Sequence, residues 1–247
     1  MDALTISAAS GLRSRMETLD MLANNLANAS TNGFKTDREF YSTYVSAEAS
    51  AASADGSQPT TVPVVEKQFT DFTQGLLTAT GNPLDLAISG NGFFTTKGPS
   101  GPLYTRNGNF RLSATGALIT AEGYPLQTQD GKTIQSQSGS PFEVTADGEV
   151  RQDGQSLGKL DIADFTDKNA VIKQGSNYFR LEDSNVKPVA ATAVQVQQGK
   201  IESSNVSSAH GAVRLVSVMR QFEMLQKAIS MSVEMNKHAI EEVARVG

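Results

Sequence analysis

Apolar residues recur at helical spacing at both ends of the chain, and the N-terminal set is the shorter one. Its members are Ala9, Leu12, Met16, Leu19, Ala23 and Leu26, separated by alternating steps of three and four residues. Such a stripe is typical of an amphipathic helix that packs against another helix. The pair Asn32-Gly33 follows the stripe and favours a left-handed backbone, so it predicts the end of the helix.

The C-terminal stripe extends over more of the chain. It consists of Leu215, Met219, Phe222, Gln226, Ile229, Val233, Asn236, Ile240 and Val243. The spacing predicts a helix over residues 211–246, which would be roughly 50 Å long at 1.5 Å per residue. A second set, Val218, Leu225, Ala228 and Met231, widens the apolar face beyond a simple two-stranded seam. One small partner would therefore leave part of this helix uncovered.

Between the stripes the pattern changes to short apolar runs separated by turn residues. All eight prolines lie between Pro59 and Pro188. Residues 104–112 predict a hairpin around Asn107-Gly108, and residues 142–151 predict another around Asp147-Gly148. The chain is therefore expected to have an α+β fold. Its terminal helices would pack as a coiled-coil-like domain, and its centre would be all-β and rich in hairpins.

A low-complexity stretch over residues 42–63 separates the first helix from the strands. It is rich in alanine and serine and has no large apolar residue from Ala47 to Thr61, so it cannot anchor a core. The expected divisions are an N-terminal helix (1–35), an extended linker (36–80), a β-rich domain (81–200) and a C-terminal helix (201–247).

Composition and charge narrow the function classes. The chain of 247 residues has no cysteine, and its net charge is −5. Acidic and basic residues are equal in number within residues 1–35 and within residues 201–247. The whole surplus of negative charge therefore lies in the centre, which argues against nucleic-acid binding. No apolar run is long enough to span a bilayer, and the first residues lack a secretory signal, so neither membrane insertion nor a cleavable signal peptide is expected.

No pattern of reactive residues predicts an active site. His210 and His238 have no serine or carboxylate motif around them, and Asp161, Asp164 and Asp167 lack the ligand pattern of a calcium loop. We therefore expect no enzyme activity, no cofactor, no metal and no small-molecule substrate.

The candidate functional residues are instead those of the two stripes, together with three asparagines on the first helix. Asparagine is a poor helix former, so these side chains either mark a fraying helix end or fix the register of a neighbouring helix. The candidate subunit interface comprises Leu12, Met16, Leu19, Asn24, Asn25, Leu26, Asn28, Leu215, Met219, Phe222, Ile229, Val233 and Ile240.

Four motifs spread along the chain resemble those of the bacterial flagellar rod and hook family. They are residues 23–35 (ANNLANASTNGFK), 81–94 (GNPLDLAISGNGFF), 104–110 (YTRNGNF) and 201–206 (IESSNV). Within the family, the chain length and residues 220–224 (RQFEM) are most similar to the proximal-rod member that adjoins the distal rod. Residues 81–94 and 121–126 (AEGYPL) are equally similar to the distal-rod member.

The resemblance implies a structural subunit that assembles with itself and with other rod proteins into a helical drive shaft crossing the periplasm. It also implies delivery by the flagellar type III export apparatus. From the residues alone, a β-rich adhesin or binding module on a coiled-coil stalk is the alternative. Such a stalk should carry one continuous heptad block, whereas here the β-rich centre separates two.

Overall fold

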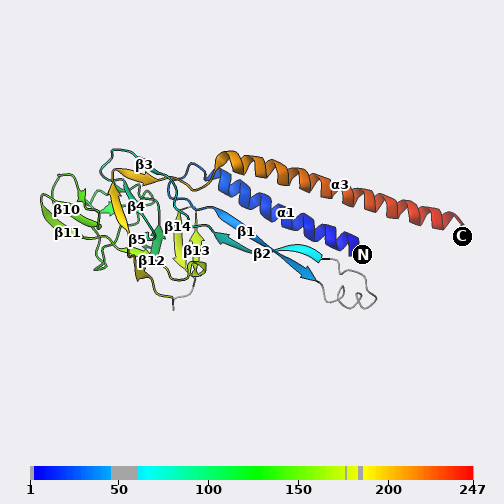
Figure 1. Ribbon diagram of the computed structural model, residues 1–247, viewed down its shortest axis with the longest axis horizontal. Helices are drawn as coiled ribbons and strands as arrows, with labels where there is room; N and C mark the ends of the chain where they lie inside the picture. Colours follow the sequence, from blue (N-terminus) through cyan, green and yellow to red (C-terminus); the bar gives the residue numbers. More distant parts are fainter. Residues whose placement is uncertain (1–2, 46–60, 176, 183–185, 247) are drawn as a thin grey trace. The chain divides into compact units, whose positions relative to one another are not determined.

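The computed structural model describes residues 3–45, 61–175, 177–182 and 186–246, and it divides the chain into two compact units (Figure 1). The first unit contains the chain up to Ala27, Asp37–Phe69 and the chain from Ser207 onward. The second contains Asn28–Thr36 and Thr70–Val206. The chain therefore leaves the first unit after Ala27, returns to it for Asp37–Phe69, and returns again from Ser207 onward.

Two helices form the larger part of the first unit. Helix α1 covers Ala3–Ala27 and helix α3 covers Ser208–Val246, and Figure 1 shows them side by side. Met21 and Leu22 of α1 and Val218 of α3 form a buried cluster. Both predicted helices are present, but α1 ends at Ala27, before the predicted stop at Asn32-Gly33. Gly33 has the expected left-handed backbone, with φ +70°.

The region predicted as an extended linker, residues 36–80, contains paired strands. Strand β1 (Asp37–Val45) pairs with β2 (Thr61–Thr70) in a two-stranded ribbon, and β3 (Leu77–Ala79) lies in the second unit. The linker prediction is thus corrected for these residues. Threonine, valine and aromatic residues are common in both ribbon strands and favour extended backbone. The middle of the low-complexity stretch, residues 46–60, lies outside the described residues.

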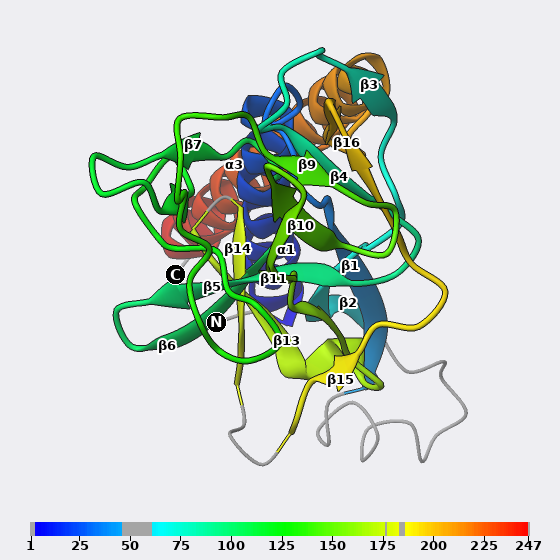
Figure 2. The same cartoon turned by 90° about the vertical axis from the view of Figure 1, so that its left-hand side faces the viewer.

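A six-stranded antiparallel sheet is the centre of the second unit. Its strands follow the order β13, β14, β6, β5, β12, β15. Figure 2 labels all of these strands except β12. These strands are β13 (Val171–Gln174), β14 (Tyr178–Leu181), β6 (Gly101–Thr105), β5 (Phe93–Gly98), β12 (Ile162–Asp164) and β15 (Val189–Ala190).

Smaller sheets complete the second unit. Strand β4 (Leu86–Ser89) pairs with β16 (Gln195–Gln198), and β3 pairs with β17 (Lys200–Glu202). A three-stranded sheet contains β9 (Glu143–Val144), β10 (Glu149–Gln152) and β11 (Gln155–Lys159), and β7 (Arg111–Leu112) pairs with β8 (Leu118–Ile119). A short 3-10 helix, η2, covers Lys168–Ala170. The predicted β-rich centre is confirmed.

The central sheet separates two hydrophobic clusters, because successive side chains of a strand point to opposite faces. Phe94 belongs to a cluster with Leu126 and Val150, whereas its neighbour Phe93 belongs to a cluster with Phe165 and Phe179. Edge-to-face ring contacts connect members of the second cluster, with centroids 5.5 Å apart for Phe93 and Phe179. Both faces of the sheet are therefore covered.

One of the two predicted hairpins is correct. Strands β9 and β10 pair across the turn at Asp147-Gly148, where Gly148 has φ +85°. The hairpin around Asn107-Gly108 is wrong, because β6 pairs with β5 and β14 while β7 pairs with β8. A Cβ on Gly108 would lie 1.5 Å from the carbonyl oxygen of Leu86, so this glycine permits a close approach of two backbones.

Candidate assembly surface and a buried polar network

The predicted interface residues of α1 lie at different depths. Leu12, Leu19 and Leu26 are partly buried, and Leu19 packs against the cluster shared with α3. Met16 keeps 51% of its surface exposed. The leucines thus contribute to packing within the chain, whereas Met16 leaves apolar surface available on this helix.

The predicted residues of α3 divide in the same way. Leu215, Phe222 and Ile229 are partly buried, and they share one face of the helix with the buried Val218. Met219 and Val233 are exposed, at 47% and 58%. The side chain of Ile240 lies outside the described residues. The face toward α1 is therefore only part of the apolar surface of α3.

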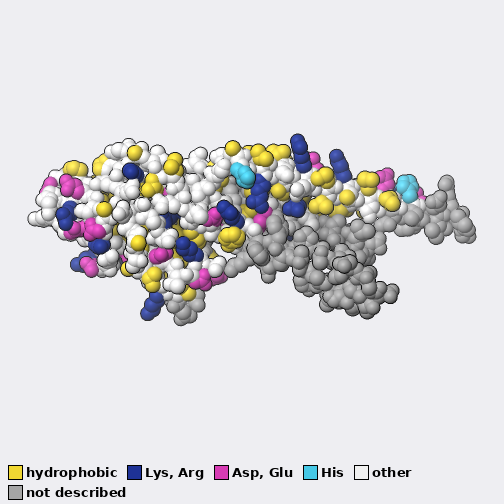
Figure 3. Space-filling view, in the orientation of Figure 1, with side chains coloured by type: hydrophobic (Ala, Val, Ile, Leu, Met, Phe, Trp, Pro, Cys, Tyr) yellow, Lys and Arg dark blue, Asp and Glu magenta, His cyan; other side chains and the backbone are white. Residues whose placement is uncertain are grey.

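A second apolar stripe runs along α3, roughly half a turn around the helix from Leu215 and Phe222 at 3.6 residues per turn. Its apolar members are Val213, Met224, Ala228, Met231 and Met235, and Ser217 lies on the same face. Val213, Met224, Met231 and Met235 are each more than 60% exposed. Figure 3 shows hydrophobic side chains mixed with basic ones along this helix. The part of α3 that the structure describes therefore has two apolar faces, one of which packs within the chain.

The three asparagines have separate roles. The Asn25 amide donates to the carbonyl oxygen of Asp37 at 2.8 Å and accepts from its N–H at 2.9 Å, so it fixes the start of β1. Asn28 lies in the loop after α1 and accepts a bond from the Thr31 hydroxyl. Asn24 is exposed. Asn25 therefore binds a strand of its own chain, and not a neighbouring helix as the register hypothesis supposed.

Glu39 of β1 connects the three elements of the first unit. One carboxylate oxygen accepts from the Thr18 hydroxyl of α1 at 2.7 Å, and the other accepts from Arg214 of α3 at 2.6 Å. The Glu39 side chain is 2% exposed, while that of Arg214 is 44% exposed. This carboxylate thus holds both helices to the ribbon by charge-assisted hydrogen bonds.

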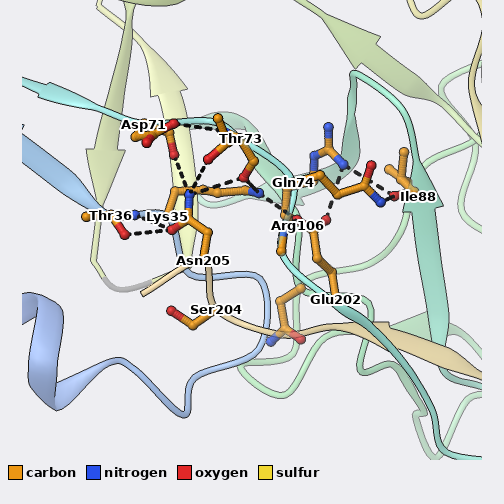
Figure 4. A network of polar contacts seen from close by, with 12 residues as sticks. Lys35, Thr36, Asp71, Thr73, Gln74, Ile88, Arg106, Glu202, Ser204 and Asn205 are labelled. Carbon is orange, nitrogen blue, oxygen red and sulfur yellow. Dashed lines mark hydrogen bonds and ion pairs between the residues drawn. The ribbon is translucent and has the colours of Figure 1, made fainter. Parts of the chain in front are cut away.

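A buried polar network in the second unit brings the sequence motifs together (Figure 4). Lys35 of the first motif donates from Nζ to Glu202 Oε1 of the last motif at 2.6 Å and to the Thr73 carbonyl at 2.7 Å. Arg106 of the central motif donates from Nη1 to Glu202 Oε2 at 3.2 Å. Lys35 and Glu202 are fully buried, and Arg106 is 3% exposed. One carboxylate therefore serves two buried cations.

Backbone groups satisfy most of the remaining polar atoms of this network. Glu202 Oε1 also accepts the N–H of Gly75 at 2.8 Å, and Arg106 Nη2 donates to the carbonyl of Gly90 at 2.7 Å. A Cβ on Gly75 would lie 2.0 Å from the carbonyl oxygen of Ser203. Only glycine therefore lets the chain at residue 75 come close enough to Glu202.

Asn205 extends the network to the other side of Lys35. Its Oδ1 accepts from the N–H and the hydroxyl of Thr36, at 2.8 Å and 2.7 Å. Its Nδ2 donates to the carbonyls of Asp71 and Thr73, at 2.8 Å and 3.1 Å. This single amide thus joins three segments of the chain, in the way that backbone pairing joins strands.

Burial dominates the electrostatics of the network. It lowers the pKa of Lys35, and the nearby Glu202 carboxylate opposes that effect. Burial also lowers the pKa of Arg106, again opposed by Glu202. Removing charge from water disfavours the charged form, whereas a close opposite charge favours it. Glu202 therefore offsets the cost of burying the charge of both cations.

Sequence reasoning did not identify this network. Lys35, Arg106, Glu202 and Asn205 all lie inside the quoted motifs, but no spacing relates residues so far apart. The available signal was their presence in motifs that resemble one family. The two histidines are exposed on α3, and among the described residues no acidic or histidine side chains gather into a metal site. Within the same part of the chain, no helix is long and apolar enough to cross a membrane.

Three family models match the chain. Residues 7–35 match "Flagella basal body rod protein", residues 87–152 match "Flagellar hook protein FlgE/F/G D1 domain", and residues 197–242 match "Flagellar basal body rod FlgEFG protein C-terminal". The matches to residues 7–35 and 197–242 cover most of α1 and α3. The match to residues 87–152 lies within the second unit, which we call the β-rich unit.

Curated proteins from several bacteria are similar over nearly the whole chain. The flagellar basal-body rod protein FlgF of Caulobacter vibrioides is 34% identical, with 92% of both chains covered. FlgG of the same bacterium is 32% identical, covering 93% of this chain and 95% of the relative. FlgG of Bacillus subtilis is 32% identical, covering 92% and 94%. The identities to FlgF and FlgG are nearly equal.

Proposed function

The chain belongs to the bacterial flagellar rod protein family, and we propose that its helices carry the assembly contacts of a subunit in the proximal rod. The protein is a structural subunit of the flagellar basal-body rod, and it serves motility. The proximal position rests on the chain length and on residues 220–224, which resemble the proximal-rod member of the family. The distal rod is the second candidate, because the chain is about equally similar to FlgF and FlgG.

The observation that carries the assembly proposal is the second apolar stripe of α3. A helix with two apolar faces can pack against α1 of its own chain and against a helix of another subunit at once. Repeating one such contact from subunit to subunit without ring closure builds a helical tube. Coiled-coil-like packing between α1 and α3, and among copies, would then form the axial part of the shaft.

Charge is arranged in a way that suits crowding of these helices. Arg220 and Lys227 flank the second stripe, with Glu223 and Glu234 beside them. Acids and bases balance within residues 201–247, so neighbouring copies would experience little net repulsion. The surplus negative charge lies in residues 36–200, and we place the charged surface of this part of the chain toward solvent or an adjoining rod layer.

The predicted interface residues have their place in this proposal. Met16, Met219 and Val233 would contact neighbouring subunits, whereas Leu12, Leu19, Leu26, Leu215, Phe222 and Ile229 would act chiefly through the packing of α1 on α3. Ile240 is proposed for the same surface from its position in the stripe. Partners would be copies of this chain and other rod proteins, after delivery through the type III export apparatus and without catalytic activity.

The variant Met224→Asp tests the assembly role of the second stripe. It places a charge on an apolar surface that is 62% exposed, so the monomer should fold normally while packing between subunits fails. We expect at least a tenfold loss of incorporation into basal bodies and non-motile cells. The control Ser230→Asp adds the same charge on the polar flank of α3 and should leave motility intact. Motile cells carrying Met224→Asp would refute the role of this stripe.

The position in the rod requires a separate measurement. Labelled subunits located in images of isolated basal bodies should lie on the side of the distal rod that faces the cytoplasmic membrane. A label found along the distal rod would assign the chain to the second candidate instead. Neither result depends on the outcome for Met224.

A further inference from the structure

The buried network joins segments that are far apart along the chain. Lys35 and Glu202 are separated by 167 residues, and Arg106 and Glu202 by 96. Asn205 binds Thr36 across 169 residues. Each of these contacts closes a loop of most of the second unit, so none can form until residues 202–205 have reached the rest of it.

Glu202 is the one carboxylate that bonds the two buried cations among the described residues. Without it, Lys35 and Arg106 would lie in the same water-excluded site with a charge of the same sign. Breaking a buried pair by removing one partner is strongly destabilising, because an uncompensated charge stays buried. A partly folded β-rich unit that lacks residues 202–205 must therefore keep this region open to water.

The stretch that leads into this segment, residues 195–202, supplies two strands. Strand β16 pairs with β4, whose Leu86 and Ile88 belong to the larger hydrophobic cluster, and β17 pairs with β3. Residues 195–205 thus complete both the charge network and these two small sheets. One stretch of chain therefore both pairs with β4 of the larger hydrophobic cluster and supplies the carboxylate that bonds the two buried cations.

We propose that closure of the Lys35–Arg106–Glu202–Asn205 network is the rate-limiting step in folding of the β-rich unit, so that this unit folds only once residues 202–205 are present. For a subunit that is delivered to its assembly site as an extended chain, this late step keeps the β-rich unit unfolded until delivery is almost complete. That biological use rests on the proposed export of the chain. The folding step itself is a property of the chain alone.

Refolding kinetics of the full chain test this step. Because a contact formed in the transition state changes the folding rate, and one formed later changes the unfolding rate, the two cases are separable. Refolding from guanidinium should be followed by pulsed hydrogen exchange and mass spectrometry of peptides from β4 to β6. We expect Glu202→Gln to slow protection of these peptides by about tenfold or more and to change the unfolding rate by less than about threefold.

Two further variants complete the experiment. Asn205→Ala removes neutral hydrogen bonds and keeps every charge, so it reports on the same step if Glu202→Gln does not fold. More than half of its loss in equilibrium stability should appear as slower refolding. The exposed Glu143 provides the control Glu143→Gln, which should change neither rate by more than about twofold. Unchanged refolding with faster unfolding, for the variant that folds, would overturn the proposal.

This outcome is independent of the rod assignment. A chain whose network closes late would still enter basal bodies if the assembly proposal is right. Conversely, a chain absent from the rod could still fold through this step. Incorporation into basal bodies therefore tests the assembly proposal, and the refolding rate tests the folding step independently of it.

Discussion

Lys35 and Arg106 show how single residues acquire their roles from distant neighbours. Both are basic side chains that ordinarily stay in water. Here the backbone carbonyls of Thr73 and Gly90, and the carboxylate of Glu202, replace that water. The motif residues therefore stabilise the β-rich unit from inside. Along the chain, Lys35 follows the end of α1 and Glu202 precedes the start of α3.

Gly33 permits part of this arrangement. It combines φ +70° with a close approach, since a Cβ there would lie 2.3 Å from the backbone nitrogen of Asn107. We expect Gly33→Ala to lower the free energy of unfolding by clearly more than the roughly 1–2 kcal/mol of a left-handed backbone alone. Gly154→Ala is the matched control, because Gly154 has φ +78° and open space around its Cα. Equal losses for both variants in denaturant titrations would show that the close approach is relaxed at little cost.

At the scale of elements, β1 is the part of the first unit that pattern reading missed. It receives hydrogen bonds from Asn25 and Thr18 of α1 and an ion pair from Arg214 of α3. Polar contacts to the ribbon thus supplement the small hydrophobic cluster between the helices. The ribbon belongs structurally with the helices, although the sequence suggested a linker.

The variant Glu39→Gln tests how much the polar contacts between β1 and the two helices stabilise the first unit. It removes the charge that binds Thr18 and Arg214, and hydrogen bonds to charged groups contribute about 1.5–3 kcal/mol. Because Arg214 is 44% exposed, we expect a loss of roughly 1 kcal/mol in the unfolding of the helices, followed by far-ultraviolet circular dichroism. The control Glu17→Gln removes only the exposed pair with Arg13 on α1 and should cost about 0.3–0.5 kcal/mol or less. A loss no larger than this control would mean that the ribbon does not hold the helices.

At the scale of the whole molecule, the two units differ in how much apolar surface they bury. Among the described residues, the larger cluster of the β-rich unit has twelve buried members, whereas the cluster between α1 and α3 has three. Stability is not uniform across such a chain, because regions with few buried contacts open at low free energy. The helices should therefore be the less stable part of the free subunit.

Amide exchange on the monomer measures this difference. We predict that residues 9–28 and α3 exchange at least tenfold faster than β4, β5 and β6, since one face of α3 has no partner in the free chain. In assembled rods the helices should become protected while the β-rich unit changes little. Strong protection across residues 9–28 in the monomer would contradict the prediction.

The sequence by itself determined the elements whose patterns are local. The helix in each terminal region follows from apolar steps of three and four, the turn at Asp147-Gly148 from its residue types, and the β-rich centre from its glycines and prolines. Only the tertiary structure decided the end of α1 at Ala27, the ribbon of β1 and β2, and the backbone crossing at Gly108. It also decided which face of α3 is buried and that Lys35, Arg106, Glu202 and Asn205 meet. These features depend on contacts between residues tens to hundreds of positions apart, and no local period or propensity encodes them.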